Sequence, residues 1–488
     1  MTGEKAAGRG RPPYWVFTLY FAEGFPYSLV RQISTVFFKD LGASLEAVGL
    51  TSLYGLPWVF KALWAPLLDA FLTKRRWLLA AEAFLAAGAV LFALAAQSPR
   101  ALPAGALAFL LLAFLSATHD IAVDGYYLEA LDRRQQAAWV GFQAMAYRLA
   151  LIAGGGGVVW LSGVLSWREG FLAAALLLGA LRLFHGRVLP AVERPGRPLA
   201  SLPPSLLRPG ALRGLLWAVL LGALLGAAVL LPGLGPARAG ASLLLRRLSL
   251  PGAVALGLLA ALLVLLLFRR RLLGRLRESD GFYARAFVEY LDRERVGVLL
   301  AFLVFYRAGE SLLLAMLYPF LATLGLGRSD YGLLYGTFGV AASILGGLLG
   351  GRIIARAGLR RAVWPLVLAQ NFPNLLYGLL ALWHGGGATV PVPAIGAFVV
   401  VESFGAGMGT AAFLVTIMRT CKREHRAAHM AVATSIMNVS SALAGVFSGF
   451  LAVRLGWPLF FLATFLAACP AMGLLPFLPV LEEEGPGG

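Results

Sequence analysis

The stretch SATHDIAVDGYYLEAL, which begins at Ser116, places ionisable side chains directly after an apolar run. Residues 101–115 contain no charged residue, and His119, Asp120 and Asp124 then follow in close succession. Ser116, Asp120 and Asp124 recur at every fourth position, so a helix would present them on one face. A carboxyl group in apolar surroundings has a raised pKa unless a cation lies nearby. Such a group can take up a proton on one side of a barrier and release it on the other.

Charged residues also interrupt the other apolar runs of the chain. A charged side chain at the centre of a membrane span costs roughly 2.5–3.5 kcal/mol, so those present are candidates for function. We expect carboxyl groups to carry a coupling proton, and Arg and Tyr side chains to bind substrate, because guanidinium groups pair well with carboxylates. The candidates for proton coupling are Asp120, Asp124, Glu23 and Glu310. The candidates for substrate binding are Arg148, Arg307, Tyr20, Tyr27, Tyr147 and Glu402.

Several of these charged residues also have a purely structural interpretation. Arg307 and Glu310 lie three positions apart and can form an ion pair within one helix. Glu402 could serve as a hydrogen-bonding group between packed helices. Lys61 and Glu82, in the second and third apolar runs, could pair with each other or reach toward the membrane surface.

His119 and Asp124 also match the H-x-x-x-x-D pattern of glycerolipid acyltransferases. Five positions along a continuous helix leave two side chains about 140° apart, so this helix does not bring the pair together. We therefore interpret His119 as a packed or hydrogen-bonded histidine. Arg148 is the cation that we expect to face Asp120 and Asp124.

The composition indicates a membrane protein with many spans. The chain has 488 residues, of which 59% are hydrophobic and 14% are charged, and its mean hydropathy is +0.78. The net charge of +18 lies mostly in short loops between apolar runs, which is typical of cytoplasmic loops and not of nucleic-acid binding. The two cysteines show no metal-binding spacing, so we expect no cofactor. The basic loops predict that both chain termini are cytoplasmic.

Apolar runs of the length needed for a membrane-spanning helix recur along the whole chain. We predict an all-α polytopic fold of about 14 spans, each of roughly 20 residues. Residues 1–189 form one six-helix half and residues 297–488 form the other. Residues 190–296 form a connector with two extra spans, near 213–233 and 252–268, and an interfacial helix. The other predicted spans lie near 14–37, 46–68, 77–97, 101–128, 138–162, 168–189, 297–324, 330–355, 362–383, 392–419, 430–453 and 457–480.

Internal repeats relate the two halves. The segment LGASLEAVGLTSLYG, around Gly49, resembles LGLGRSDYGLLYGTFG, around Gly332, and a basic segment from Arg133 resembles one from Lys422. Two halves related in this way are typical of the major facilitator superfamily, in which the substrate site lies between the halves. The repeats therefore predict a major facilitator fold.

A loop pattern supports the same fold. The segment GGLLGGRIIARAGLRR, residues 346–361, resembles the superfamily's motif between the second and third spans of each half. Glycines let two helices approach closely, and the basic residues hold the loop in the cytoplasm. The first half keeps an acid and a basic cluster at the corresponding place but lacks the glycines. The candidate gate residues are Asp69, Gly347, Gly351, Arg352 and Arg360.

The segments around Asp120 and Arg148 resemble a more specific family. SATHDIAVDGYYLEAL followed by WVGFQAMAYRLALIAGGG is similar to the fourth and fifth spans of AmpG-type muropeptide permeases and of the related acetyl-CoA transporters. YGLPWVFKALWAPLLD and FYRAGESLLLAMLYPFL resemble the family's second and seventh spans. The resemblance covers most of both halves, whereas the connector agrees only in general plan.

This resemblance implies proton-driven import of cell-wall degradation products across the bacterial inner membrane by alternating access. The typical substrate is N-acetylglucosaminyl-1,6-anhydro-N-acetylmuramic acid, with or without its peptide. We therefore expect a monomeric transporter, not an enzyme, whose partners are protons, the lipid bilayer and an amino sugar–peptide. The alternatives are a transporter of another solute (a drug, a sugar or an acyl-CoA-like anion), a membrane-embedded acyltransferase and a lipid flippase.

Overall fold

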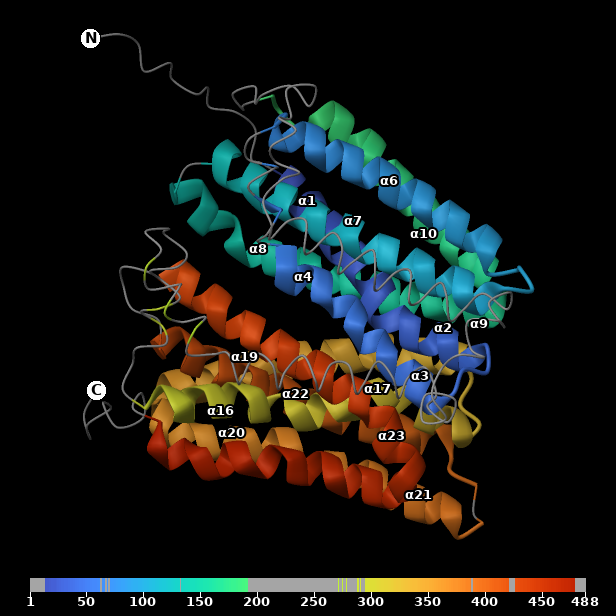
Figure 1. Cartoon of the computed structure of the whole chain (residues 1–488), viewed down its shortest axis with the longest axis vertical. Helices are drawn as coiled ribbons and strands as arrows, with labels where there is room; N and C mark the ends of the chain where they lie inside the picture. Colours follow the sequence, from blue (N-terminus) through green and yellow to red (C-terminus); the bar gives the residue numbers. More distant parts are fainter. Residues whose placement is uncertain are drawn as a thin grey trace.

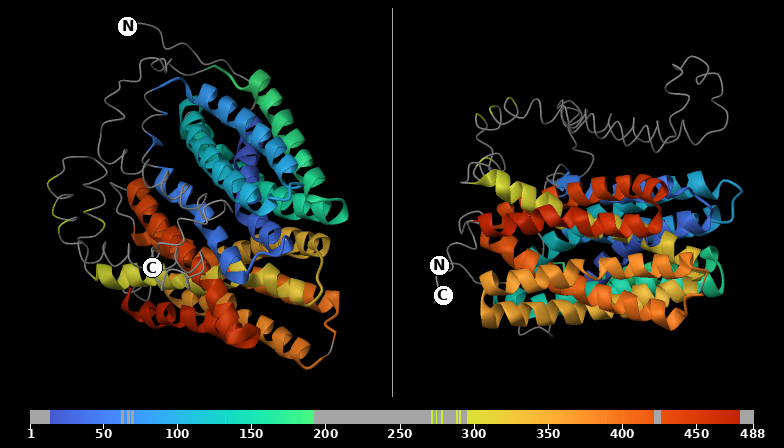
Figure 2. Two further views of the ribbon diagram at one scale, coloured as in Figure 1. Left: turned by 45° about the vertical axis from the view of Figure 1, so that its right-hand side comes forward. Right: turned by 90° about the horizontal axis from the view of Figure 1, so that it is seen from below.

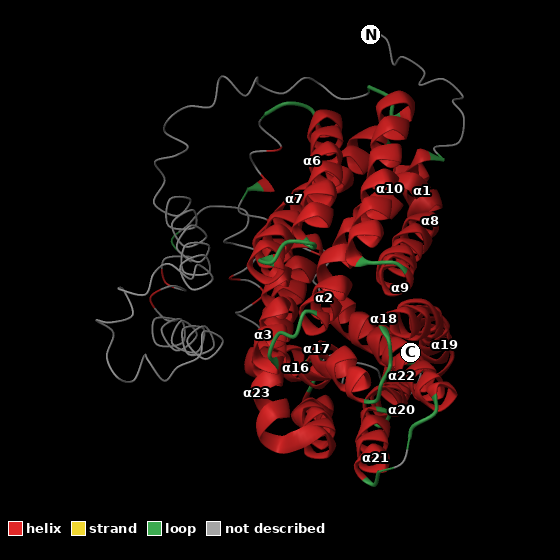
Figure 3. Ribbon diagram, turned by 90° about the vertical axis from the view of Figure 1, so that its right-hand side faces the viewer, coloured by secondary structure: helices red, strands yellow, loops and turns green. Residues whose placement is uncertain are grey.

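The computed structural model describes residues 14–61, 71–131, 133–191, 295–387, 389–420 and 426–478, together with isolated residues between these ranges. The elements of this part of the chain are helices joined by short turns (Figure 3). Nine of the described helices are long and apolar enough to cross a membrane. The all-helical membrane fold expected from the sequence is thus confirmed.

The N-terminal bundle, coloured blue to green in Figure 1, comprises the helices between residues 15 and 188. They are α1 (Trp15–Ser28), η1 (Leu29–Ile33), α2 (Ser34–Asp40), α3 (Leu45–Gly49), η2 (Leu50–Gly55), α4 (Leu56–Phe60), α6 (Lys74–Ala95), α7 (Ala101–Ala130), α8 (Arg133–Leu151), η4 (Ile152–Val158), α9 (Val159–Val164) and α10 (Trp167–Val188). Ser44, Thr73 and Ser166 cap α3, α6 and α10 by accepting a backbone N–H in the first turn.

The C-terminal bundle, coloured yellow to red, lies beside the first (Figures 1 and 2). It comprises α16 (Val296–Tyr306), α17 (Ala308–Thr323), α18 (Arg328–Tyr331), η7 (Gly332–Gly339), α19 (Val340–Ala357), α20 (Leu359–Asn371), α21 (Asn374–Gly385), α22 (Val392–Thr420), α23 (Arg426–Leu474) and η9 (Leu475–Phe477). Gly456 divides α23, because its φ of 70° reverses the chain there. The two parts of α23 correspond to the last two predicted spans.

The described helices account for the six predicted spans of each half. The first two spans are built from short helical pieces, and α23 contains two spans in one element. Most of residues 192–294 lie outside the described residues. The two extra spans, the interfacial helix, the count of 14 and the domain boundaries therefore stay predictions.

The outward faces of both bundles are apolar. Leu107 and Leu176 are 64% and 76% exposed, and Leu382 and Leu348 of the C-terminal bundle are also largely uncovered. Exposed leucines along whole helices are the surface that a bilayer requires, because lipid tails offer no polar contacts. The polar side chains that matter are instead found inside each bundle.

The two bundles meet closely at one end of the molecule, here called the sealed end, where α2, α9 and α17 finish (Figure 1). The opposite end, where α6 begins and α19 finishes, is called the basic end. At the seam, Gly49 faces the backbone of Gly445, and a Cβ atom on Gly49 would lie 2.8 Å from the Gly445 carbonyl oxygen. A Cβ atom on Gly156 would likewise lie 3.1 Å from the backbone of Gly336 and 2.4 Å from the Thr337 hydroxyl oxygen. Glycines allow this contact because the backbones themselves touch.

These two glycine contacts follow the sequence repeats. Gly49 belongs to the repeat segment that aligns with Gly332, and Gly332 faces Gly156 and Trp160 across the seam. Counted without the two extra predicted spans, the Gly49–Gly445 contact joins the second span to the eleventh. The Gly156–Gly336 contact joins the fifth span to the eighth. The seam is formed twice, by equivalent parts of the two halves.

An ion pair spans the same seam. Arg328, at the start of α18, donates to the Asp40 carboxylate at the end of α2 over 3.0 Å. The Trp167 indole N–H donates to the same Asp40 oxygen over 2.8 Å. The Arg328 guanidinium also lies 5.2 Å from the centre of the Trp167 ring, within range of a cation–π interaction. Polar contacts thus close the outer rim of a seam whose interior includes the close glycine contacts and apolar side chains from both bundles.

In the predicted gate motif, the glycines in close contact are those one position before Gly347 and Gly351. Helix α19 approaches α22 at Gly346 and Gly350, where a Cβ atom would meet the backbone of Phe404 or Met408. Gly347 makes only an ordinary contact, and a Cβ atom on Gly351 would meet open space. The close approach expected of the motif's glycines thus falls on Gly346 and Gly350, because a shift of one residue turns a helix position by about 100°, and the gate role of Gly347 and Gly351 stays a prediction. Arg352 and Arg360 are exposed at the basic end, and Asp69 lies outside the described residues.

Gly156 and its neighbour Gly157 provide a matched test of the seam. We expect Gly156→Ala to lower the free energy of unfolding by about 1–3 kcal/mol, because the new methyl group meets the Thr337 hydroxyl and the backbone of Gly336. Gly157→Ala should leave it unchanged or slightly higher, because a Cβ atom there has no neighbour within 4 Å. Thermal unfolding of the two variants in detergent measures the difference. Equal midpoints would contradict a tightly packed seam at η4.

Candidate functional site

A cluster of charged residues lies inside the N-terminal bundle. Lys61, directly after α4, forms an ion pair with Asp120 of α7. The Tyr20 hydroxyl of α1 donates a hydrogen bond to Asp124 of α7 over 3.1 Å. Glu23, one turn further along α1, interacts with Asp120, Asp124 and Lys61. These residues are called the acid cluster below.

The acid cluster contains more negative than positive charge. Its carboxyl groups belong to Glu23, Asp120 and Asp124, and within the described residues Lys61 is the cation that pairs with them. Glu23 is 8% exposed, and its Oε2 atom has no hydrogen-bond partner in the described part of the chain. A buried carboxylate without its own cation is costly. The arrangement therefore calls for a proton, or for a cationic ligand, near Glu23.

The polar stripe of α7 becomes progressively more exposed toward the basic end. Ser116 is buried, the Asp120 side chain is 13% exposed, and Asp124 is exposed. The residues share a helix face, as their spacing predicts. A route for protons along this face would thus run from a buried position to an open one.

Two predicted pairings in the N-terminal bundle are wrong. Arg148 is exposed, and the cation that pairs with Asp120 is Lys61 instead. Lys61 and Glu82 do not pair, because Glu82 faces His185 at 2.6 Å and His119 at 3.5 Å. The sequence offered one clue to Lys61, namely a lysine in an apolar run, but not which acid it would meet.

His119 and Asp124 point to different partners. His119 is buried beside Glu82, whereas Asp124 binds Tyr20. The two side chains are therefore not arranged as the histidine–aspartate pair that an acyltransferase site would need. The structure agrees with the angular separation expected from a continuous helix.

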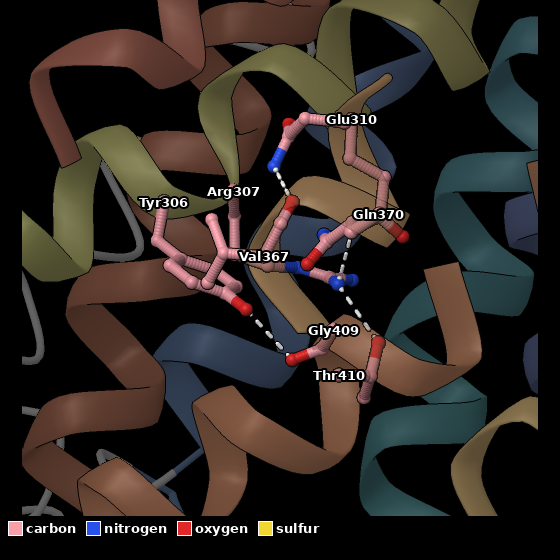
Figure 4. Close-up of polar contacts among 8 residues, drawn as sticks. Tyr306, Arg307, Glu310, Val367, Gln370, Gly409 and Thr410 are labelled. Carbon is pink, nitrogen blue, oxygen red and sulfur yellow. Dashed lines mark hydrogen bonds and ion pairs between the residues drawn. The ribbon is translucent and has the colours of Figure 1, made fainter. Parts of the chain in front are cut away.

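A second polar cluster lies in the C-terminal bundle (Figure 4). Glu310 Oε2 accepts hydrogen bonds from Arg307 Nη1 over 2.5 Å and from Gln370 Nε2 over 2.6 Å. Arg307 Nη1 also lies 3.3 Å from the Thr410 hydroxyl. The Tyr306 hydroxyl donates to the Gly409 carbonyl over 2.7 Å. The cluster thus joins α17, α20 and α22, and its charges balance.

Arg307 lies at a break in its span. Helix α16 ends at Tyr306 and α17 begins at Ala308, with Arg307 between them at φ −93° and ψ −7°. Glu310 occupies the first turn of α17, where a negative charge is favoured by the helix dipole. Broken helices of this kind line substrate sites in many transporters. Arg307 Nε and Gln370 Oε1 are buried and have no hydrogen-bond partner within the described residues.

The remaining candidates are placed as follows. Tyr27 packs against Tyr147 and Trp58, at ring-centre distances of 5.9 and 5.1 Å, and forms an aromatic wall beside the acid cluster. Glu402 is 2% exposed and accepts a hydrogen bond from Ser403 over 3.2 Å. Glu402 therefore lies in the interior of the C-terminal bundle, where it interacts electrostatically with Glu310.

Comparisons of sequence and structure match the chain to membrane transporters. The Major Facilitator Superfamily profile matches residues 298–487, and the profile of the BT1 family matches residues 23–203. A crystal structure of a POT family transporter in complex with 5-aminolevulinic acid superposes with a TM-score of 0.67, covering 96% of each chain at 14% identity. The nucleoside transporter NupG superposes with a TM-score of 0.54, covering 96% of this chain and 98% of that one, at 14% identity. Over residues 298–487 the chain is thus similar in sequence to the major facilitator superfamily.

Relatives that match nearly the whole chain include AmpG-type proteins. The chain is 24% identical over 466 residues to the anhydromuropeptide permease of Escherichia coli (strain K12), covering 94% of this chain and 77% of the relative. It is 20% identical over 475 residues to a Rickettsia conorii protein named AmpG 4, covering 95% of each. An uncharacterised Haemophilus influenzae protein is 25% identical over 480 residues, covering 95% of this chain and 93% of the relative. The expected family resemblance is thus confirmed.

The Lys61–Asp120 pair gives a prediction that does not depend on transport. We expect Lys61→Met to lower the free energy of unfolding by about 1–3 kcal/mol, because it leaves Asp120 without its cation. Adding Asp120→Asn to Lys61→Met should restore most of this loss, since the unpaired charge is then removed. Thermal unfolding in detergent measures both effects, and Lys39→Met at the sealed end serves as the control. A double variant no more stable than Lys61→Met would refute the pairing.

Proposed function

We propose that the protein is a proton-coupled importer of anhydromuropeptides in the cytoplasmic membrane of a bacterium. The observation that carries this proposal is the acid cluster, in which Glu23, Asp120 and Asp124 share Lys61 within the described residues. The substrate class is supported by similarity over 94% of the chain to the anhydromuropeptide permease of E. coli.

In the proposed mechanism, Glu23 holds the transported proton inside the N-terminal bundle. Its carboxyl group is buried beside two other acids, so a proton removes a charge that the interior cannot stabilise. Asp124, which is exposed, exchanges protons with the aqueous side. Lys61 forms an ion pair with Asp120 while the proton is on another group. Protonation of Asp120 would break this ion pair and release Lys61. Proton binding and the Lys61–Asp120 pair therefore compete.

The substrate is proposed to bind between the acid cluster and the C-terminal cluster. The Arg307 guanidinium can pair with a carboxylate of the peptide in place of Glu310, because a guanidinium group donates two parallel hydrogen bonds to a carboxylate. Tyr27 and Tyr147 offer aromatic faces on which sugar rings can stack. Gln370 and Thr410 add uncharged hydrogen-bonding groups beside Arg307.

The proposed orientation places the basic end in the cytoplasm, because Lys and Arg are enriched in cytoplasmic loops. The sealed end then faces the periplasm. In this conformation the seam of Gly49, Gly156 and Gly336 and the Asp40–Arg328 pair close the periplasmic side. Import requires these contacts to open and reform in each transport cycle.

Substitution of Glu23 or Asp124 tests the coupling role. We expect Glu23→Gln and Asp124→Asn to abolish pH-gradient-driven accumulation of labelled anhydromuropeptide in proteoliposomes, because neither amide can carry the proton. Exchange of internal for external substrate at equal concentrations should continue, since it needs no net proton movement. Asp330→Asn, which alters an exposed carboxylate at the sealed end, should accumulate substrate normally. Wild-type accumulation by both test variants would remove the acid cluster from the coupling mechanism.

The substrate assignment has its own test. Wild-type proteoliposomes with an inward proton gradient should accumulate labelled N-acetylglucosaminyl-anhydro-N-acetylmuramyl peptide, and unlabelled compound should compete. Arg307→Gln should raise KM for the peptide-bearing form by about tenfold or more, as for a lost charge-assisted hydrogen bond, and change uptake of the peptide-free disaccharide less. Absence of any accumulation by the wild type would favour a different solute for the same fold.

A further inference from the structure

A second group of buried ionisable side chains lies behind the acid cluster. Glu82 of α6, His119 of α7 and His185 of α10 are each fully buried. His185 Nδ1 lies 2.6 Å from Glu82 Oε1, and His185 Nε2 lies 3.1 Å from the Thr18 hydroxyl of α1. His119 Nε2 lies 3.5 Å from the same Glu82 oxygen. This group, called the histidine cluster, thus touches four helices of the N-terminal bundle.

Counting donors shows that the Glu82–His185 pair shares one proton. The Thr18 hydroxyl donates its hydrogen to the Trp15 carbonyl over 3.1 Å, so it accepts from His185 Nε2. The hydrogen bond between His185 Nδ1 and Glu82 then uses a second proton, which lies on either the imidazole or the carboxyl group. In both cases the pair has no net charge. A neutral, hydrogen-bonded pair can remain buried without the penalty of an isolated ion.

The histidine cluster connects the two helices that carry the acid cluster. Thr18 lies two positions before Tyr20 on α1, and His119 directly precedes Asp120 on α7. A change in the rotation or height of α1 relative to α7 would separate the Tyr20 hydroxyl from Asp124, which now lie 3.1 Å apart. We infer that Glu82 and His185 are positioning residues: through Thr18 and His119 they fix α1 against α7 and so set the geometry of the acid cluster. This inference rests on the proposed function of that cluster.

The test reads the acid cluster directly, without substrate or a proton gradient. A water-soluble carbodiimide modifies carboxyl groups, and the rate at which Asp124 is modified in the purified, detergent-solubilised protein is followed by mass spectrometry. Tyr20→Phe removes the hydrogen bond to Asp124 and should speed its modification by about threefold to tenfold, the range for one hydrogen bond. Glu82→Leu and Thr18→Val should produce a similar increase. Neither should add to the effect of Tyr20→Phe in a double variant.

Two matched variants separate positioning from other effects. In the Glu82→Gln variant, Asp124 should be modified at a rate close to that of the wild type. A Gln amide can donate a hydrogen bond to His185 Nδ1 and so keep α6 joined to α10. Tyr54→Phe removes another hydrogen bond onto α7, from Tyr54 to the Ala106 carbonyl over 3.1 Å, and should also leave the rate unchanged. Thr18→Val alters one half-buried side chain of the same shape, so it keeps the test available if Glu82→Leu does not fold.

The inference is overturned if Asp124 is modified at the wild-type rate in folded Glu82→Leu and Thr18→Val. It is also overturned if the rate increase of either variant multiplies with that of Tyr20→Phe in the double variant. An increase in Glu82→Gln equal to that in Glu82→Leu would also overturn it, because charge and not the hydrogen bond would then be responsible. Failure of the proposed transport function is recognised separately, since it would abolish uptake by the wild type and leave these modification rates as predicted.

Discussion

The structure depends on the high free energy of a charge removed from water. Each ionisable side chain inside the bundles must find a partner or lose its charge, because neither lipid nor apolar side chains can stabilise an isolated ion. The C-terminal cluster meets this requirement with a balanced pair, Arg307 and Glu310, supported by Gln370. The histidine cluster meets it with a shared proton. The acid cluster does not fully meet it with its described residues, since its three carboxyl groups share one cation, Lys61, which pairs with Asp120.

The same constraint separates the parts of the protein that hold a fixed arrangement from those that must change. The seam at the sealed end combines close glycine contacts and an ion pair at its rim with buried apolar side chains from both bundles. Inside the N-terminal bundle, buried hydrogen bonds join α1, α6 and α10, and the His119–Glu82 contact adds α7. A movement of whole bundles about rigid interiors is the motion that this distribution of contacts allows.

The sequence predicted the membrane class, the helical spans and the acids that face the interior of the N-terminal bundle. Those features follow from local patterns: apolar runs of a fixed length, and a period of four along Ser116, Asp120 and Asp124. It did not predict that Lys61 would pair with Asp120, because the pair brings together residues from two helices that are far apart in the chain. Arg148 was as plausible a partner on charge alone.

Other errors have the same origin. The glycine pattern of residues 346–351 indicated close helix packing, but the positions in contact, Gly346 and Gly350, depend on how α19 is rotated against α22. Glu82 was a charge in an apolar run with no local partner, and both of its histidines come from distant positions in the sequence. Periodicity gives the face of a helix, whereas the facing residue is set by the packing of the whole bundle.

The central claim is that the acid cluster carries the proton that drives transport. The most direct measurement is the pH inside proteoliposomes, read from a trapped fluorescent dye after anhydromuropeptide is added outside. The account predicts that the interior acidifies with wild-type protein as substrate enters, and that Glu23→Gln abolishes this acidification while substrate exchange continues. Acidification by Glu23→Gln at the wild-type rate would contradict the account.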